Sequence, residues 1–249
     1  MSEEQPHSAL AALLKVQIKA VVFDAVGTVI YAMPSVATVY CDTLEKLSGQ
    51  TVDVDVVRSV LAKRLAARSA THDLATSENA EREFWFNLIN ELVPVKTRRQ
   101  ECFDALYEHF ARPENWRCYD DVAESLNRLL HKGLQVVIAS NFDERLHRVC
   151  DGLNELQPVS HRVISSEVGW RKPAKQFFET VCERTGCQAS EVLFVGDDPH
   201  NDIHGASSFG MPAVWIDRRG GPVGAIEEAM PPKLSEDVWK IRSLRDLVQ

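Results

Sequence analysis

Residues 19–28 read Lys-Ala-Val-Val-Phe-Asp-Ala-Val-Gly-Thr, and this stretch decides the fold. Residues 19–24 contain a continuous apolar run, which predicts a short strand that is buried on both faces. Asp24 ends the run, and Gly27 permits the turn that follows it. The stretch therefore predicts a buried strand with a carboxylate at its carboxyl end.

Similar apolar runs recur along the chain and alternate with helical patterns. Further strands are predicted at 135–139, 161–164, 192–195 and 212–216. Between them lie two apolar helix faces, which are formed by Val122, Leu126, Leu129 and Leu130 and by Phe177, Phe178, Val181 and Cys182. This alternation predicts an α/β fold, a doubly wound and mostly parallel sheet with right-handed crossovers and helices on both faces.

The connection after the first strand is too long for a loop. Residues 25–134 separate that strand from the one at 135–139, whereas such connections normally span a few residues. Within the gap, apolar residues recur with helical spacing in four segments, which begin at Val36, Val57, Phe84 and Phe103. We therefore expect an inserted all-α domain at 34–112 and an α/β core formed by 1–33 and 113–249. The Pro- and Gly-rich segment 219–232 predicts an exposed loop.

Polar side chains stand at the ends of the predicted strands, where ligands bind in open parallel sheets. They are Asp24, Ser140, Asn141, Asp197 and Asp198, together with Lys172 in a loop before Pro173. Each has a structural explanation, because aspartates cap turns and helices and loop lysines are commonly solvated. Their shared order along one sheet edge nevertheless predicts a single crevice.

The segments that carry these residues are FDAVGT (23–28), ASN (139–141), GWRKP (169–173) and VGDDPHND (195–202). In this order they resemble motifs one to four of the haloacid dehalogenase-like hydrolase superfamily. The resemblance covers about residues 19–249, and the predicted insertion is similar in position and length to the helical cap of subfamily I. The segments SNFDERL and SSEVGWRKP look closest to an uncharacterised branch of the superfamily.

The resemblance implies a Mg²⁺-dependent site that transfers a phosphoryl group through an aspartyl-phosphate intermediate. It implies that Asp24 is the nucleophile, that Ser140 donates to a phosphoryl oxygen and that Lys172 holds nucleophile and phosphate together. Thr28, which positions the nucleophile loop, and Asn141 belong to the implied substrate-binding set. The implied metal ligands are Asp24, the backbone carbonyl of Val26, Asp197 and Asp202, the last directly or through water. Mg²⁺ prefers such an all-oxygen set, and a site of this kind works by placement and charge stabilisation.

Val26 departs from the family pattern. Phosphatases of the superfamily carry a second Asp there, which protonates the leaving oxygen and later activates water. Its loss is expected to cost about 10²–10⁴-fold in rate, or roughly 3–5 kcal/mol of barrier. Three explanations stay open: a substrate with a good leaving group, such as an acyl phosphate; another proton donor; or a feeble or inactive hydrolase that binds a phosphorylated ligand or a partner. The candidate donors are Asp198, His200, His72 and Asp73.

Two other reactions of the superfamily are disfavoured. The 2-haloacid dehalogenases carry Tyr at this position and replace the acids of motif four, whereas this chain has Val26 and keeps Asp197 and Asp202. Phosphonatases use a cap lysine that forms a Schiff base. Lys46 and Lys63 lie in the insertion, but both are expected on exposed helix faces with nothing to lower their pKa values.

Two groups in the insertion have both a structural and a functional interpretation. Phe84, Trp85 and Phe86 could line a substrate pocket, although helical spacing favours the cap core for Phe84 and Trp85. Arg98 and Arg99 could steer an anion, although a solvated helix start is the simpler interpretation. The insertion therefore predicts no particular substrate.

Composition limits the partners and the location. The net charge of -8 argues against nucleic-acid binding, which needs Lys and Arg to neutralise phosphates. The sequence contains no run of about 18 apolar residues, so no membrane span is expected. The segment MSEEQPHSAL lacks the layout of a signal peptide. The 6 cysteines contain no CxxC pair and predict reduced thiols. We expect a cytoplasmic monomer or homodimer that acts on a small phosphorylated metabolite.

Overall fold

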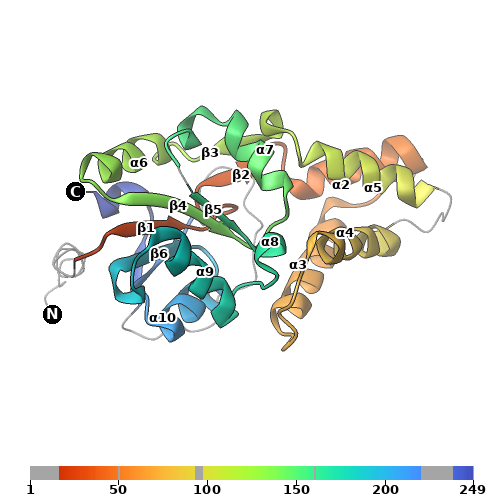
Figure 1. Ribbon diagram of the computed structural model, residues 1–249. Helices are drawn as coiled ribbons and strands as arrows, with labels where there is room; N and C mark the ends of the chain where they lie inside the picture. The colour runs from red at the N-terminus through yellow and green to blue at the C-terminus, as the bar shows by residue number, and fades with distance from the viewer. Residues whose placement is uncertain (1–16, 50, 93–97, 160, 220–237, 249) are drawn as a thin grey trace, which may run out of the picture.

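The computed structural model describes residues 17–49, 51–92, 98–159, 161–219 and 238–248 (Figure 1). The expectation of no signal peptide concerns residues 1–16, which lie outside the described part of the chain. The exposed loop predicted at 219–232 lies outside it as well, apart from Arg219.

The core is a 6-stranded sheet in the order β5-β4-β1-β6-β7-β8. Its strands are β1 (Ala20–Phe23), β4 (Gln135–Ser140), β5 (His161–Ile164), β6 (Val192–Gly196), β7 (Ala213–Ile216) and β8 (Trp239–Ile241). Every neighbouring pair is parallel, which confirms the predicted doubly wound α/β fold. Phe23 is paired with both Ile138 and Val195, so the strand ends that carry Asp24, Ser140 and Asp197 stand almost level.

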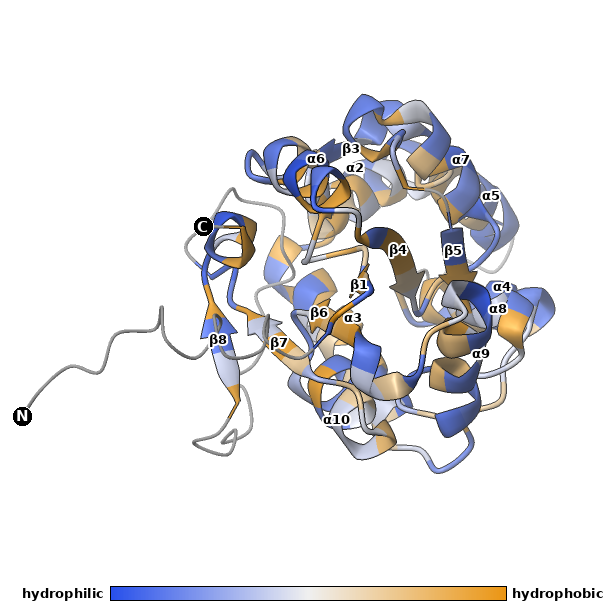
Figure 2. Cartoon of the chain, turned by 60° about the vertical axis from the view of Figure 1, so that its left-hand side comes forward, coloured by the Kyte–Doolittle hydropathy of each residue, from blue (hydrophilic) through white to orange (hydrophobic). Residues whose placement is uncertain are grey.

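Two layers of helices cover the sheet because the side chains of β1 alternate between its faces. Val21 and Phe23 belong to the apolar core that includes α6 (Val122–His131) and α7 (Arg145–Gly152). Ala20 and Val22 belong to the core that includes α9 (Lys175–Thr185) and α10 (Gly205–Phe209). Figure 2 shows the central strands in hydrophobic colours between helices whose outer faces are hydrophilic. Each large apolar side chain buried in this way contributes roughly 1.5–3 kcal/mol relative to exposure.

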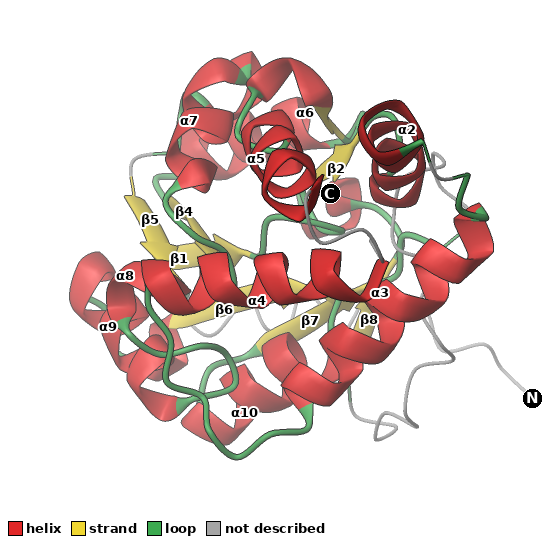
Figure 3. Cartoon of the chain, turned by 90° about the vertical axis from the view of Figure 1, so that its right-hand side faces the viewer, coloured by secondary structure: helices red, strands yellow, loops and turns green. Residues whose placement is uncertain are grey.

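Four helices fill the region between β2 and β3, as the apolar spacing predicts. They are α2 (Val36–Ser48), α3 (Val54–Ser69), α4 (Glu78–Leu92) and α5 (Arg99–His109). Local caps set the bounds of α2: the Ser35 hydroxyl accepts from the Thr38 amide at 3.3 Å, and Gly49 takes the left-handed conformation at the other end. Asp53 caps α3 by accepting from the amide of Asp55 at 2.7 Å. Figure 3 shows these helices from their own side, lying across the end of the sheet.

A small two-stranded sheet joins the helices to the core. β2 (Ile30–Ala32) and β3 (Trp116–Cys118) are antiparallel, and the Met33 amide donates to the Asn115 carbonyl at 2.9 Å just beyond them. The chain therefore enters the helical segment through β2, a few residues after Asp24, and leaves it through β3, which lies beside β2. These two strands were not predicted from the sequence.

All 6 cysteines lie in the described part of the chain, and each is a free thiol. Among the described residues, no helix has both the length and the apolar character needed to cross a membrane.

Candidate active site

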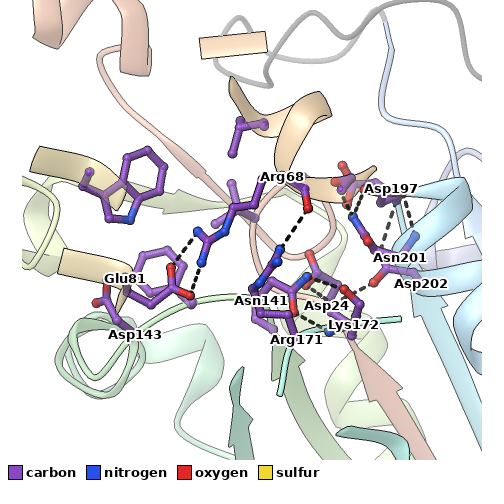
Figure 4. A pocket seen from close by; sticks show the side chains of 18 of the residues that line it. Asp24, Arg68, Glu81, Asn141, Asp143, Arg171, Lys172, Asp197, Asn201 and Asp202 are labelled. Atoms are coloured by element: carbon purple, nitrogen blue, oxygen red, sulfur yellow. Dashed lines mark hydrogen bonds and ion pairs between the residues drawn. The ribbon is translucent and has the colours of Figure 1, made fainter. Parts of the chain in front are cut away.

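Three carboxylates meet at the carboxyl edge of the sheet. Asp24 follows β1, Asp197 follows β6, and Asp202 lies in a short helix at Pro199–His204. Ligand oxygens of the three lie within 4.8 Å of one another, and Figure 4 shows the side chains converging on one cavity. The strand-end crevice predicted from the sequence is thus where these residues meet.

Two glycines make this convergence possible. Gly27 has φ of +86°, and a Cβ there would lie 2.1 Å from Oδ2 of Asp197. A Cβ on Gly196 would lie 2.2 Å from Oδ2 of Asp202. Any larger residue at either position would displace an acidic side chain, so the loop geometry and the acidic cluster depend on each other.

Lys172 bridges two of the carboxylates. Its Nζ donates to Oδ1 of Asp24 and to Oδ1 of Asp202, both at 2.6 Å, and to the carbonyl of Ala139 at 3.0 Å. The side chain is 2% exposed. Burial alone would lower the pKa of Lys172, but the charges of Asp202 and Asp24 outweigh it and raise the pKa above its usual value. Lys172 therefore stays an ammonium group.

The cluster fits a divalent cation. Burial raises the pKa of Asp202 to about 7 even though Lys172 opposes the shift, and the charges of Asp24 and Asp198 add to it. The Lys172 ammonium contacts Asp24 and Asp202, and Asp197 belongs to the same cluster of ligand oxygens. Oxygen donors from a few carboxylates are the set that Mg²⁺ prefers. Asp24, Asp197 and Asp202, with the backbone carbonyl of Val26, are the groups that would hold the ion.

The other predicted site residues have different surroundings. Ser140 is buried and lines the cavity, and its hydroxyl has no hydrogen bond within the described part of the chain. Asn141 also lines the cavity, but its Oδ1 accepts from the Lys172 amide at 2.7 Å and its Nδ2 donates to the Lys172 carbonyl at 3.1 Å. Asn141 thereby fixes the loop that carries Lys172, a contact that the sequence did not predict.

Thr28 lies behind the cavity. It is fully buried, does not line the cavity, and donates from its hydroxyl to Oδ1 of Asp197 at 3.2 Å. Its carbonyl accepts from Nη2 of Arg218 at 2.8 Å and from Nε at 3.2 Å. The structure thus places Thr28 next to a candidate metal ligand and leaves its predicted contact with substrate untested.

A buried ion pair supports the loop that follows Asp24, through Thr28. Arg218 donates to both oxygens of Asp121, at 2.7 and 2.9 Å. The same carboxylate accepts from the Ser243 hydroxyl at 2.9 Å and from the Leu244 amide at 2.8 Å. The C-terminal segment is thereby joined to the loop that carries Asp24. Sequence reasoning missed Asp121 and Arg218, because nothing in their neighbourhoods indicates a partner about a hundred residues away.

The cavity has a volume of about 200 Å³, and the helical segment forms one of its walls. Leu65 and Arg68 of α3 and Glu81 and Trp85 of α4 line this wall. Arg68 and Glu81 form a two-pronged ion pair, with one N···O distance of 2.8 Å. Trp85 packs against the apolar core, as its helical spacing predicts, and its half-buried side chain also lines the cavity.

None of the residues proposed to replace the missing proton donor at Val26 is both unpaired and part of the cavity lining in the described part of the chain. His72, Asp73 and His200 are exposed and lie outside its lining. Asp198 lines the cavity, but it caps the short helix by accepting from the amides of His200 at 2.8 Å and Asn201 at 2.9 Å. In the described part of the chain, the two cavity acids outside the strand-end cluster and its cap, Glu81 and Asp143, are each paired with an arginine.

Lys46, Lys63 and Arg98 of the insertion are solvent-exposed, as their structural interpretation predicts. Lys46 and Lys63 are exposed, and neither lines the cavity. Arg98 is exposed and pairs with Glu101 at 2.5 Å, at the start of α5. The Schiff-base lysine that a phosphonatase needs has therefore no candidate among the described residues of the cavity lining except Lys172, which is held as an ammonium group.

The strand-end acids and the parallel sheet agree with a comparison of the whole chain with known proteins. A family model for haloacid dehalogenase-like hydrolases matches residues 18–210, so the chain belongs to this family. Haloacid dehalogenase-like hydrolase domain-containing protein 3 of Danio rerio is 27% identical over 217 residues, which cover 84% of this chain and 88% of the relative.

Solved structures share the fold. A dehalogenase in an intermediate complex superposes with a TM-score of 0.69 and 21% identity, covering 93% of this chain and 96% of the other. A Bacillus subtilis HAD-hydrolase, YfnB, bound to magnesium superposes with a TM-score of 0.66 and 18% identity, covering 93% of this chain and 97% of the other. At these identities the similarity supports the fold and not a particular substrate.

Proposed function

We propose that the protein is a Mg²⁺-dependent phosphatase that hydrolyses a small phosphorylated metabolite through an aspartyl-phosphate at Asp24. The observation that carries the proposal is the geometry at the sheet edge. A nucleophile-like carboxylate, two further acids and a buried ammonium lie within contact distance at the end of one cavity.

The residues suggest how the reaction would proceed. An oxygen of Asp24 attacks the phosphorus atom, and the bond from phosphorus to the leaving oxygen breaks with its electron pair. Lys172 balances the charge of the carboxylate and orients it, while the Ser140 hydroxyl donates to a phosphoryl oxygen. Water then attacks the phosphorus of the aspartyl-phosphate, which releases inorganic phosphate and restores the carboxylate. Mg²⁺, when bound, would neutralise charge on the phosphoryl oxygens.

In this proposal residues 34–112 form a cap domain, and 1–33 with 113–249 form the catalytic core. The paired strands β2 and β3 are the natural place for the boundary, because both connections between the two parts run through them. The α3 and α4 side chains that line the cavity would exclude water from the reacting atoms and choose the substrate.

Two other functions make different demands on the site. Dehalogenation in this superfamily works with Ser and Asn in place of the acids of motif four, and this chain has Asp197 and Asp202 there. A non-catalytic protein that binds a phosphorylated ligand or a partner would need the same anion-binding groups but no nucleophile. The missing acid at Val26 keeps this second alternative open to experiment.

Turnover of acetyl phosphate with Mg²⁺ tests the proposal. Its leaving group is a carboxylate, so the missing acid should matter little. We expect Asp24→Asn to lower the rate at least about 10³-fold, with Asp42→Asn, an exposed change on α2, as the matched control. The proposal fails if Asp24→Asn retains the wild-type rate. It fails equally, in favour of a binding protein, if wild type binds Mg²⁺ and phosphate but turns over no acyl or ester phosphate.

A further inference from the structure

A second cavity adjoins the first on the side of the helical segment. Its volume is about 180 Å³, and its lining is mainly apolar. The aromatic members of the lining are Tyr40, Trp85, Phe103, Tyr107, Phe110, Trp116 and Phe142. For comparison, a cavity of about 150 Å³ lined by apolar side chains is large enough to bind benzene. The second cavity is therefore of the right size and character for an aromatic ring.

Val26 lies at the junction of the two cavities. It lines both of them, as do Leu65, Trp85 and Phe142, so the two cavities adjoin along a shared wall. A ligand with its phosphoryl group at Asp24 can thus extend past Val26 into the aromatic cavity. The residue at which phosphatases of the family carry the acid for the leaving oxygen is here an apolar part of the path.

The charged group that lines the aromatic cavity, Arg145, is already paired with a carboxylate. Arg145 donates to both oxygens of Asp143 at 2.7 Å, and its guanidinium lies 3.8 Å from the ring centroid of Tyr107. A sugar or polyol placed here would leave hydroxyl groups without partners, which costs free energy. The lining therefore selects against hydroxyl-rich metabolites.

The Tyr40 hydroxyl is a polar group of the cavity that a ligand can use. Tyr40 is 3% exposed and lines the cavity, and its hydroxyl has no hydrogen bond within the described part of the chain. Burial raises the pKa of Tyr40, so the hydroxyl stays protonated. A polar substituent on a ring could receive this hydrogen bond.

From these observations we infer that the substrate joins an aromatic ring to the phosphoryl group through an oxygen that departs as an anion. This inference rests on the phosphatase function proposed above. Without an acid at Val26, the leaving oxygen must carry the electron pair of the broken bond unprotonated. A phenol has a pKa of about 10 and a carboxylic acid of about 4, whereas water, which resembles an aliphatic alcohol, has about 15.7. Aryl phosphates and aromatic acyl phosphates satisfy both the leaving-group chemistry and the shape of the cavity.

The reaction balances without a general acid. Asp24 forms a bond to phosphorus as the bond from phosphorus to the aryl or acyl oxygen breaks, and the product leaves as phenolate or carboxylate. Water then supplies the oxygen for inorganic phosphate and loses its proton to solvent or to the phosphate itself. A phenolate takes its proton from solvent after it has left the site.

Two pairs of substrates separate the ring from the leaving group. Benzoyl phosphate and acetyl phosphate both release a carboxylate and differ in the ring, whereas phenyl phosphate and cyclohexyl phosphate are similar in size and differ in leaving group. We expect kcat/KM to favour benzoyl over acetyl phosphate by at least about tenfold, and phenyl over cyclohexyl phosphate by at least about 10²-fold. The first pair also identifies an acyl substrate, and the second an aryl substrate.

Variants of the aromatic cavity complete the test. Val36 lines the aromatic cavity and not the cavity at Asp24. Val36→Phe should therefore fill part of the aromatic cavity and lower the benzoyl-to-acetyl ratio of kcat/KM at least about tenfold. Phe103→Leu provides a second, more conservative change in the same cavity. The matched control is Val56→Phe, since Val56 is 51% exposed and lines neither cavity.

The outcomes separate the two proposals. Asp24-dependent turnover of acetyl phosphate with no advantage for a ring, and with a ratio unchanged in both cavity variants, overturns the aromatic substrate and leaves the phosphatase. Absence of turnover with all four phosphates overturns both. A ring advantage that falls in the cavity variants and persists in Val56→Phe supports the inference.

Discussion

The two walls of the cavity hold their charges in opposite ways. On the core wall, Asp24 and Asp202 share one buried ammonium, that of Lys172, and Asp197 lies in the same cluster of carboxylates. On the helical wall, Arg68 and Glu81 neutralise each other. The core wall is thus built to recruit a cation and a phosphoryl group, whereas the helical wall brings no net charge and presents apolar surface beside its ion pair. In this arrangement the core determines the reaction, and the helices determine what is attached to the phosphoryl group.

Among the substitutions that compare the two walls, removal of the shared ammonium should have the largest effect on stability. Lys172→Met leaves buried carboxylates without their counter-charge, which typically costs about 3–5 kcal/mol of stability. Turnover of acetyl phosphate should fall at least about 10²-fold because the charge-stabilising donor is lost. Urea unfolding and initial rates measure the two effects.

The control for this change is Lys175→Met. Lys175 follows within the same stretch but its side chain is 73% exposed, so a change within about 0.5 kcal/mol is expected. Equal effects of the two substitutions would remove the contrast between a shared buried charge and an ordinary surface charge.

Val26→Asp tests the junction between the walls. An added acid should raise the rate on cyclohexyl phosphate by about 10²–10⁴-fold if the missing proton donor limits that reaction. The rate on acetyl phosphate should change much less, since a carboxylate leaves without protonation. Val26→Asn is the control, because it has the same shape without an acidic proton. A folded Val26→Asp that binds Mg²⁺ and gains nothing over Val26→Asn would contradict this interpretation of Val26.

A double-mutant cycle tests whether the helical wall is self-contained. Arg68→Met leaves Glu81, whose side chain is 4% exposed, without its partner and should cost about 3 kcal/mol of stability. The double variant Arg68→Met/Glu81→Gln should regain part of that loss, because no buried charge is then left alone. The exposed pair Arg98 and Glu101 serves as the comparison, with an expected coupling below about 1 kcal/mol. If the losses of stability from changing Arg68 and Glu81 simply add in the double variant, the two side chains are not coupled and the helical wall is not self-contained.

The smallest predicted effect concerns the support behind the core wall. Burial alone would raise the pKa of Asp121, but Arg218 and the hydrogen bonds from Leu244 and Ser243 lower it below the usual 3.8. This interaction therefore stabilises the folded state above pH 3.8, and its contribution is lost as the pH falls through the lowered value.

Asp121→Asn should accordingly cost about 1–3 kcal/mol near neutral pH. The cost should shrink in acid, which unfolding in urea at about pH 7 and about pH 3 would measure. A cost that is the same at both values, or larger in acid, would show that the carboxylate is not what supports the loop.

The sequence predicted those parts of the fold that depend on local pattern. Four of the five strands between residues 20 and 216 that pair in the core sheet contain continuous apolar runs, and the four inserted helices have apolar faces. The exception is β5, which begins with His161 and Arg162. β8, β2 and β3 were not predicted, because each has three residues and mixes buried with partly or fully exposed side chains. Their pairing depends on partners elsewhere in the chain, which a short pattern cannot specify.

In the candidate site, too, the sequence predicted what depends on local pattern and missed what depends on distant partners. Asp24, Ser140 and Asp197 were located because strand ends meet at one edge of a parallel sheet, and Asp202 was located by the resemblance of VGDDPHND to a motif of the family. The contacts from Asn141 to Lys172 and from Arg218 to Thr28 join segments 31 and 190 residues apart and have no local signal. Helical spacing identified the apolar role of Trp85, which packs against the core, but spacing cannot show that the same side chain also lines a cavity.

Whether Asp24 is phosphorylated can be observed by mass spectrometry of the protein quenched in acid during turnover of acetyl phosphate with Mg²⁺. We expect one phosphoryl group on the peptide that contains Asp24, absent from Asp24→Asn and from protein stripped of divalent ions. Turnover that proceeds with no phosphoryl group on that peptide, or with the group on another residue, would contradict the proposed role of Asp24.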